Sequence, residues 1–291
     1  MTKNDSEYQI ILGKIRKLHD EKILCLHFIP VVFFETIKGI NSVKAFEKMQ
    51  INVRRASELC NKHIFPDTAI HLRNTAHLSS INETQEKGKN WLQIFRRLSI
   101  CTNYANFKKQ FEALQNEIAF KLKENHRFSI NYIENRLKNI DHLAKKEQHS
   151  IIKSRIFMNC MRKTFLLEGI KHFGLESLKD NYSIDQIETK LRGLTYFKYS
   201  CANLFKKYLR PDRRKRPRES DYCDIVQTVY LDLCDYIVTS DKSFADTVNN
   251  SGCEYLEDRV ILYEDFKNEL DNFSLQKKAL SSSNIEIPPF E

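Results

Sequence analysis

Residues that break secondary structure are scarce in this chain, which has 7 glycines and 6 prolines among 291 residues. All-β architectures need many tight turns, and glycine and proline supply the backbone conformations of those turns. The scarcity therefore favours a protein built mainly from helices. Hydrophobic residues make up 41% of the sequence, so a chain of this length can bury a substantial core, as one large domain or two modest ones.

Long hydrophobic runs and targeting patterns are also absent. No apolar run approaches the roughly 18 residues that suggest a membrane-spanning helix, and the N-terminus lacks the basic-then-apolar pattern of a signal peptide. We therefore expect a cytoplasmic protein with no membrane partner. None of the eight cysteines forms a CxxC pair, and most lie in apolar contexts such as Leu24-Cys25-Leu26. This pattern is typical of reduced core cysteines in a cytosolic protein.

Several well-known catalytic motifs are missing as well. The sequence has no Gly-rich phosphate loop, no GxSxG and no HExxH, which argues against kinases, lipases and zinc proteases. His71 and His77 share a loop region without neighbouring cysteines, so we expect no zinc there. The chain does carry excess positive charge, with 47 Lys and Arg against 38 Asp and Glu. A polyanionic partner such as RNA or DNA explains that excess, and so do solvated lysine-rich helix faces.

Strand and helix patterns alternate at the two ends of the chain, and helical patterns fill the middle. The elements that we predict at the ends are, in chain order, a helix over 8–18, a buried strand over 22–28, a helix or strand over 31–37, a helix over 220–231 with Ser220 at its N-cap, a strand over 235–239, a helix over 243–249, a strand over 259–263 and a helix over 264–273. Most of the middle helices begin at Ser or Asn, as helix N-termini prefer. They cover 42–63, 90–99, 106–124, 129–146, 150–173 and 183–208, with a loop over 65–84.

This order predicts an α/β core with a short parallel sheet, formed by the two chain ends and interrupted by a large all-helical insertion. The predicted parts are the N-terminal part of the core at 8–41, the helical insertion at 42–208, the C-terminal part of the core at 209–275 and a tail at 276–291.

Acidic residues in the C-terminal part have a pattern typical of metal sites. Asp221 and Asp224 are three residues apart, so both lie on one face at the start of a helix, where negative charge is stabilised. Asp241 follows the end of a predicted strand, at the edge where open α/β sheets bind ligands. Carboxylates from these two places can share one hard cation. Each Asp taken singly also fits a helix start or a turn.

The segment 220–244, SDYCDIVQTVYLDLCDYIVTSDKSF, resembles the second half of a PIN domain. In that family an Asp opens a helix, and a strand then ends in Thr-x-Asp followed by an aromatic residue. The strand and helix patterns over 259–266 are similar to the family's last strand and helix. The resemblance implies a small α/β/α sandwich in which acidic residues bind Mg²⁺ or Mn²⁺. It also implies hydrolysis of phosphodiester bonds, in RNA more than in DNA, and a role as a toxin or defence-system effector.

The resemblance extends to individual residues. Asp224 matches the acid at the helix start, Asp241 the acid after the strand, and Thr239 the Thr that precedes it, while Asp221 is an additional acid on the same helix face. Glu35 matches a Glu that the family places on a helix after its second strand. Independently, Glu35 is a lone charge in the apolar segment 31–37, where an unpaired carboxylate is costly to bury. A metal ion bound by Glu35 would remove that cost, and so would a position of Glu35 on the exposed edge of a helix.

A basic run precedes the acidic residues directly, and its two prolines disfavour a regular helix. The basic residues are well placed to hold a phosphate backbone beside the acids, or they belong to a solvated loop. Those that we predict to contact substrate are Arg213, Arg214, Arg216 and Arg218.

PIN domains begin with an apolar strand that ends in an Asp, and this chain departs from that pattern. The only acid in a comparable place, Asp5, follows no apolar strand. Either the chain is truncated at its start, or the site lacks one acid, or another residue substitutes. The leading hypothesis is thus a Mg²⁺- or Mn²⁺-dependent endonuclease. The alternatives are a catalytically impaired PIN-like scaffold that binds nucleic acid or, through its helical insertion, a protein partner, and a purely helical interaction protein.

Overall fold

The computed structural model describes residues 3–30, 32, 37–60, 63–76, 93–211, 217–218 and 220–282. Four of the predicted site residues lie outside this part of the chain, namely Glu35, Arg213, Arg214 and Arg216. His77 also lies outside it. Their predicted roles stay predictions.

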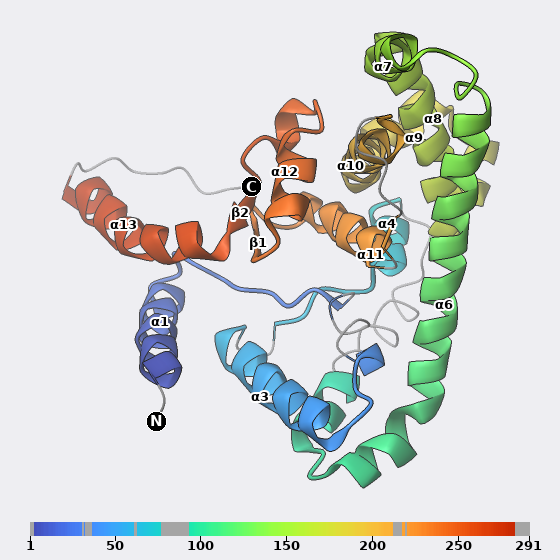
Figure 1. The fold of residues 1–291 in the computed structure, drawn as a ribbon. Helices are drawn as coiled ribbons and strands as arrows, with labels where there is room; N and C mark the ends of the chain where they lie inside the picture. The colour runs from blue at the N-terminus through green and yellow to red at the C-terminus, as the bar shows by residue number, and fades with distance from the viewer. Residues whose placement is uncertain are drawn as a thin grey trace.

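Helices make up most of the described chain (Figure 1). The α-helices are α1 (Lys3–Asp20), α3 (Val43–Leu59), α4 (Thr68–Thr75), α6 (Tyr104–Lys138), α7 (Lys145–Lys153), α8 (Arg155–His172), α9 (Ile184–Lys190), α10 (Arg192–Leu209), α11 (Asp221–Val226), α12 (Lys242–Asn249) and α13 (Tyr263–Ser282). The 3₁₀ helices are η1 (Glu176–Asp180), η2 (Gln227–Asp232) and η3 (Glu254–Leu256), and residues 93–100 are also helical. The strands are β1 (Ile237–Thr239) and β2 (Val260–Leu262).

The two strands pair in parallel, with Ile237 opposite Val260 and Thr239 opposite Leu262. The prediction of a mixed α/β fold with a short parallel sheet is therefore confirmed. Arg259, just before β2, fixes the approach to β1, because its Nη2 donates to the carbonyl oxygens of Leu231 at 2.9 Å and Cys234 at 2.6 Å.

In the described part of the chain both strands of the sheet come from the C-terminal region, so the prediction that the two chain ends build it together is wrong. The segment 22–28 is extended but joins no sheet. It makes one isolated β-bridge, at Phe28, which accepts from the amide of Phe65 at 3.0 Å and donates to the carbonyl of His63 at 2.9 Å. A single bridge leaves the remaining backbone groups without a strand ladder, which is why the apolar pattern there does not produce a strand.

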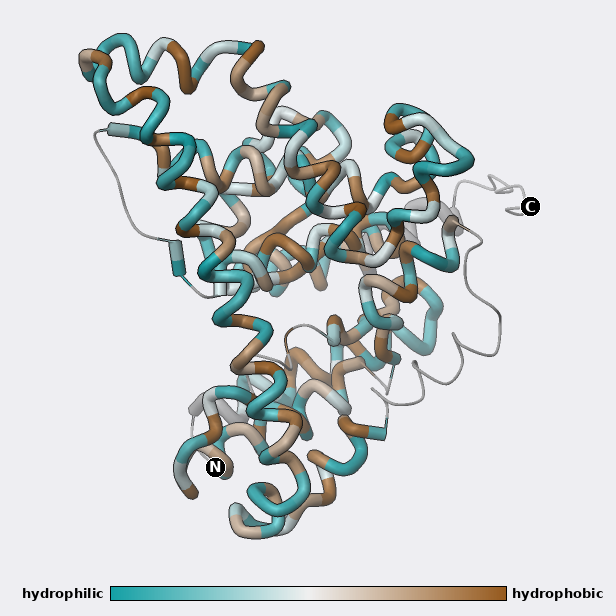
Figure 2. The backbone as a smooth tube through the Cα atoms, turned by 90° about the vertical axis from the view of Figure 1, so that its right-hand side faces the viewer, coloured by the Kyte–Doolittle hydropathy of each residue, from teal (hydrophilic) through white to brown (hydrophobic). Residues whose placement is uncertain are grey.

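One large hydrophobic core joins the middle helices to the C-terminal elements. Its centre is α10, which packs against α8, η2 and α12. Gly193 lets α10 approach η2 closely, since a Cβ at this position would lie 2.7 Å from the carbonyl oxygen of Val229. Figure 2 shows hydrophobic stretches gathered where the helices pack, with hydrophilic stretches on the outside. The predicted helical insertion and the C-terminal part thus share one core, and the domain division stays a prediction.

A second, smaller core holds the two ends of the chain together. Ile11, Ile15 and Leu18 of α1 pack with Phe266 and Leu270 of α13. Two ion pairs flank this contact, Lys14 with Asp271 at 2.7 Å and Lys267 with Glu7 at 2.9 Å. The helix predicted over 264–273 continues to Ser282, into the region predicted as a tail.

Serine explains two of the wrong helix boundaries in the middle of the chain. Ser129 does not start a helix, because its hydroxyl donates to the carbonyl of Asn125 at 3.0 Å inside the continuous helix α6. Ser154 does start one, and its side chain accepts from the amide of Phe157 at 3.2 Å, so the helix predicted over 150–173 is two helices. The loop predicted over 65–84 contains α4, whose N-cap Asp67 accepts from the amide of Ala69.

Cysteine burial differs from the prediction at two exposed positions. All eight cysteines are free, and Cys60, Cys101, Cys201, Cys223 and Cys253 are buried, but Cys160 is exposed, and so is Cys25. Leu24 and Leu26 are half-buried on either side of it, because neighbouring side chains of an extended segment point in opposite directions. Among the described helices, none combines the length and the apolar character that crossing a bilayer requires.

Candidate active site

Asp241 lies two residues beyond the carboxyl end of β1 and is the N-cap of α12. Its Oδ1 accepts from the amide of Phe244 at 3.0 Å, and its own amide donates to the hydroxyl of Thr239 at 3.0 Å. The Thr-x-Asp-x-x-Phe pattern therefore describes one turn in which Thr239 orients the backbone and Asp241 begins the helix. Its second oxygen, Oδ2, faces Arg218.

Asp221 opens α11 and is buried, with 4% of its surface exposed. Its Oδ2 accepts from the hydroxyl of Tyr208 and from the amide of Arg218 at 2.6 Å, and its Oδ1 accepts from Nε of Arg218 at 2.8 Å. Ser220 stands at the N-cap of α11, as predicted, but its backbone is already helical and its side chain makes no cap bond. Asp221, held by two neighbours, fixes the entry to the helix instead.

Arg218 brings the three acids together. Its Nη2 lies 4.0 Å from Oδ2 of Asp224 and 3.7 Å from Oδ2 of Asp241, while its Nε bonds Asp221. The facing oxygens of Asp224 and Asp241 are thus no farther apart than twice 4.0 Å. We call Asp221, Asp224 and Asp241 the acidic cluster. The hydrogen bond and charge of Asp221 raise the pKa of Arg218, with smaller contributions from Asp241 and Asp224.

A cleft of about 930 Å³ opens beside Asp221, between the end of α10 and α12. Lys206, Lys207 and Arg210 line one side, and Asp246 lines the other. Lys207 spans the cleft, because its Nζ donates to the hydroxyl of Thr247 and to the carbonyl of Ser243. Burial lowers the pKa of Lys207, although the charges of Asp246, Asp241 and Asp221 raise it in part. Cationic and anionic side chains therefore meet in one cleft.

The sequence patterns do not predict Lys206, Lys207, Tyr208 or Asp246 as site residues, although all four line this cleft. Lys207 and Tyr208 directly precede the basic run, so their proximity in sequence was a usable signal. The predicted domain boundaries place both residues in the helical insertion, apart from the predicted α/β core. Asp246 follows Asp241 by five residues and has no motif of its own. It reaches the cleft only because α12 packs against α10.

The remaining predicted residues separate into two groups. The structure brings Arg218 and Thr239 to the acidic cluster, but Arg218 contacts acids there, where the sequence predicted contact with phosphate. His71 is buried beside Tyr230 and is 3.5 Å from a carboxylate oxygen of Asp232.

Comparison of the chain with protein-family models found no match, and comparisons with curated proteins and with solved structures found none either.

Proposed function

We propose that this chain is a metal-dependent nuclease with a PIN-like core, and that the acidic cluster is its active site. The observation that carries the proposal is the convergence of three carboxylates from two elements on one guanidinium group. The guanidinium of Arg218 is a positive charge at the centre of the cluster. The carboxylates that attract it would also attract a metal cation at the same place. The cluster lies at the carboxyl edge of the parallel sheet, as ligand sites in α/β sheets do.

The donor set fits a hard divalent cation such as Mg²⁺ or Mn²⁺, because all of its ligand atoms are carboxylate oxygens. Asp224 and Asp241 are the residues that would hold the ion, since their side chains are 20% and 37% exposed and each directs Oδ2 toward the same point. The three carboxylates do not all lie within 4.8 Å of one another. Removal of the bulky guanidinium from between them would let them approach.

Asp221 suits a positioning role more than a ligand role. Both of its oxygens accept hydrogen bonds, from Tyr208 and from Arg218. It therefore holds the start of α11 in place, and with it Asp224. A bound divalent cation would supply the nucleophile by lowering the pKa of a coordinated water, and would neutralise charge on the phosphate.

The side chains that line the cleft are suited to bind the substrate. Lys206, Lys207 and Arg210 place positive charge beside the acids, which suits a phosphodiester backbone drawn along the end of α10. The phosphate contacts predicted for Arg213, Arg214 and Arg216 stay predictions, because these residues lie outside the described part of the chain. RNA is the preferred substrate class in this proposal, and the role as a toxin or defence-system effector stays part of it.

Cleavage of labelled RNA in the presence of Mn²⁺ tests the proposal, with wild type beside the double variant Asp224→Asn, Asp241→Asn. We expect cleavage by wild type and a loss of at least about 100-fold in the double variant, because both metal ligands lose their charge. Asp235→Asn is a matched control, since Asp235 is exposed and stands two residues before β1, as Asp241 stands two residues after it. Equal cleavage by wild type and the double variant would remove the acidic cluster from the mechanism.

A catalytically impaired scaffold is the second candidate, and one observation favours it. Arg218 already compensates the acidic cluster from within the chain. In that case neither wild type nor the double variant cleaves RNA, while wild type still binds it with an affinity that falls steeply with salt. Reversing the charge of Lys206 and Arg210 should then abolish binding.

A further inference from the structure

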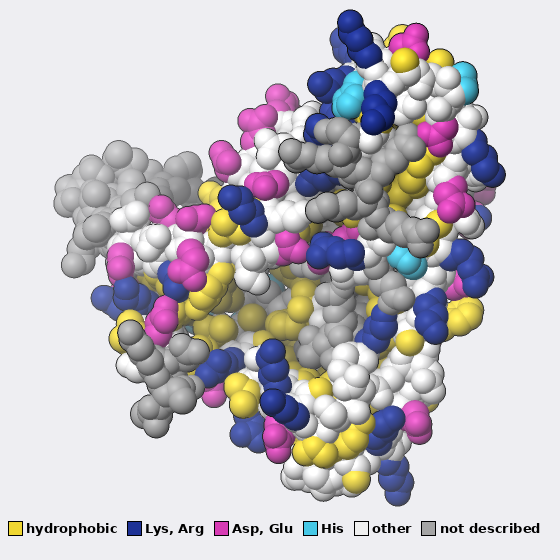
Figure 3. All heavy atoms as spheres, viewed as in Figure 1, with side chains coloured by type: hydrophobic (Ala, Val, Ile, Leu, Met, Phe, Trp, Pro, Cys, Tyr) yellow, Lys and Arg dark blue, Asp and Glu magenta, His cyan; other side chains and the backbone are white. Residues whose placement is uncertain are grey.

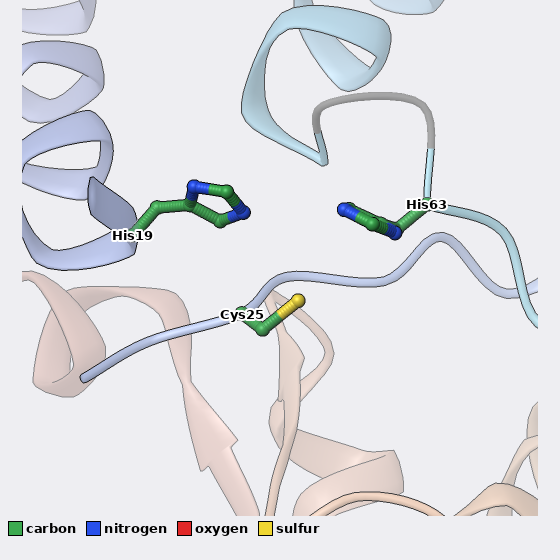
Figure 4. A group of neighbouring side chains, drawn as sticks. All are labelled: His19, Cys25 and His63. Atoms are coloured by element: carbon green, nitrogen blue, oxygen red, sulfur yellow. The ribbon is translucent and has the colours of Figure 1, made fainter. Parts of the chain in front are cut away.

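His19, Cys25 and His63 lie together on the face of the molecule near the N-terminal helix, far in sequence from the acidic cluster (Figure 4). Their ligand atoms all lie within 4.8 Å of one another, and among the described residues theirs is the one such group of three or more His, Cys, Asp or Glu side chains. We call them the histidine–cysteine cluster. Figure 4 shows the two imidazole rings facing each other, with the sulfur of Cys25 directed into the space between them.

The end of α1 places two of these residues side by side. Lys22 adopts a left-handed backbone conformation with φ of 57°, and the amide of Ile23 donates to the carbonyl of Leu18 at 2.9 Å. This is the hydrogen bonding of a helix end that reverses the chain. It leads the extended segment 22–28 back past the last turn of α1, so Cys25 returns to His19.

The third residue is brought in by the isolated β-bridge of the same segment. Phe28 donates to the carbonyl of His63 at 2.9 Å and accepts from Phe65 at 3.0 Å. His27 stacks on Phe65 with ring centroids 4.5 Å apart and also contacts the ring of His63. Three separate pieces of chain therefore hold the histidine–cysteine cluster, and each is fixed by its own backbone or ring contacts.

From this geometry we infer that His19, Cys25 and His63 form a binding site for a zinc-type divalent cation. Imidazole nitrogen and thiolate sulfur are the donors that Zn²⁺ prefers, and Mg²⁺ and Mn²⁺ favour oxygen instead. Zinc bonds of about 2.0–2.3 Å place tetrahedral ligands roughly 3.5 Å apart, so small side-chain rotations close the cluster onto an ion. Three protein ligands leave a fourth position for water.

The surroundings fit such an ion. Cys25 and His63 are exposed and His19 is half-buried, so solvent reaches the cluster without any opening of the fold. A carboxylate oxygen of Asp20 lies 3.9 Å from Nδ1 of His19, close to the place of the acidic partner that commonly orients a metal-bound imidazole. A groove of about 600 Å³ runs from the cluster to Tyr236 and Val238 beside β1. Figure 3 shows hydrophobic side chains in the hollow between α13 and α3.

The ion would fasten the segment 22–28 to the molecule. That segment joins α1, and hence the small terminal core, to the rest of the chain, with a single β-bridge along its length. Cross-linking it through His19 and His63 should hold the two hydrophobic cores in one arrangement. Binding to the folded chain alone stabilises it by mass action.

The test uses the full chain stripped of metal and titrated with Co²⁺, which replaces Zn²⁺ and reports a thiolate ligand by its charge-transfer absorption. We expect one Co²⁺ per chain with the thiolate band in wild type, loss of the band in Cys25→Ser, and at least tenfold weaker binding in His19→Gln and His63→Gln. Zn²⁺ should raise the Tm of wild type by several degrees and leave that of the three variants unchanged.

Matched controls are Cys160→Ser and His142→Gln, since Cys160 and His142 are also exposed and should keep the band. The double variant Asp224→Asn, Asp241→Asn should keep it too, which separates this site from the acidic cluster. Absence of the band in wild type, or its persistence in Cys25→Ser, would overturn the inference. Circular dichroism verifies the fold of each variant, so that loss of binding is read only from folded protein.

Discussion

The acidic cluster and the histidine–cysteine cluster differ in how their charges are compensated. In the acidic cluster, Arg218 supplies a positive charge from within the chain, and hydrogen bonds from Tyr208 and from backbone amides occupy several of the carboxylate oxygens. The histidine–cysteine cluster offers imidazole nitrogens and a cysteine sulfur in place of carboxylates, and two of its three side chains are exposed. One cluster is built into the packing of α10, α11 and α12, and the other lies on the surface.

This difference indicates whether each cluster contributes to the stability of the fold without a bound cation. Buried carboxylates must remain paired, because an uncompensated buried charge is costly. The acidic cluster therefore contributes to folding whether or not it binds an ion. Exposed imidazole and thiol groups carry no such requirement, so the histidine–cysteine cluster contributes to stability only when a cation links its members.

The largest effect that we expect is on the stability of an Asp221 variant. Asp221→Asn should lower the free energy of unfolding by about 2–3 kcal/mol, because the side chain is buried and loses charge-assisted bonds from Tyr208 and Arg218. The value lies at the lower end for buried pairs, since Arg218 is 60% exposed. Urea denaturation measures it. Asp224→Asn is the control and should cost far less; equal costs would contradict the assigned difference in roles.

Replacing Arg218, the positively charged side chain within the acidic cluster, should strengthen the binding of a metal ion to that cluster. In Arg218→Gln, we expect Mn²⁺ to bind about tenfold more tightly than in wild type, because the guanidinium no longer competes for Asp224 and Asp241. Isothermal titration calorimetry provides the affinities. Zn²⁺ binding at the histidine–cysteine cluster should stay the same in this variant. Unchanged Mn²⁺ affinity would show that Arg218 and the metal do not share a place.

Two substitutions at Asp241 separate its role in the fold from its role in the site. Asp241→Ala should lose about 1 kcal/mol of stability, because α12 loses its N-cap bond to Phe244. Asp241→Asn should keep nearly all of that stability, since an amide oxygen also caps a helix, yet it should bind Mn²⁺ as weakly as the Ala variant. Thermal denaturation and metal titration together decide this. Equal stability of the two variants would argue against the capping role.

The smallest effect concerns His172, a surface histidine that contacts aromatic rings. Its ring packs against Phe173 and Tyr222, and desolvation by its neighbours lowers its pKa, while the charge of Asp67 raises it and that of Lys121 lowers it. Since the folded pKa lies below the unfolded value, the unfolded chain takes up the proton first. Stability therefore falls as the pH drops through the pKa of the unfolded histidine, and the fall is small because His172 is exposed to water.

Urea denaturation of wild type and His172→Gln over this pH range checks the prediction. The dependence should be shallower in the variant, because the titrating group is absent. A wild-type curve that rises toward pH 6 would contradict the lowered pKa of His172.

Local patterns predicted the C-terminal third well. The alternation of apolar residues predicted β1, α12 and β2 within a few residues of their observed limits, because hydrophobic periodicity and turn residues act over short distances. The prediction of a strand over 22–28 was wrong for a related reason. An apolar run shows that a segment can be buried, but a strand also needs a partner for its backbone. Both strands that pair in the sheet lie elsewhere, so the segment stays extended.

The sequence by itself determined which residues have acidic, basic and metal-binding chemistry, and it determined the Thr239 to Phe244 turn that presents Asp241. Only the tertiary structure decided which of these residues meet. Arg218 was expected to contact phosphate and instead joins three carboxylates, and Cys25 was expected in the core and instead lies between two histidines. The physical reason is that short-range patterns set the conformation of each segment, whereas contacts between distant residues depend on how the helices pack.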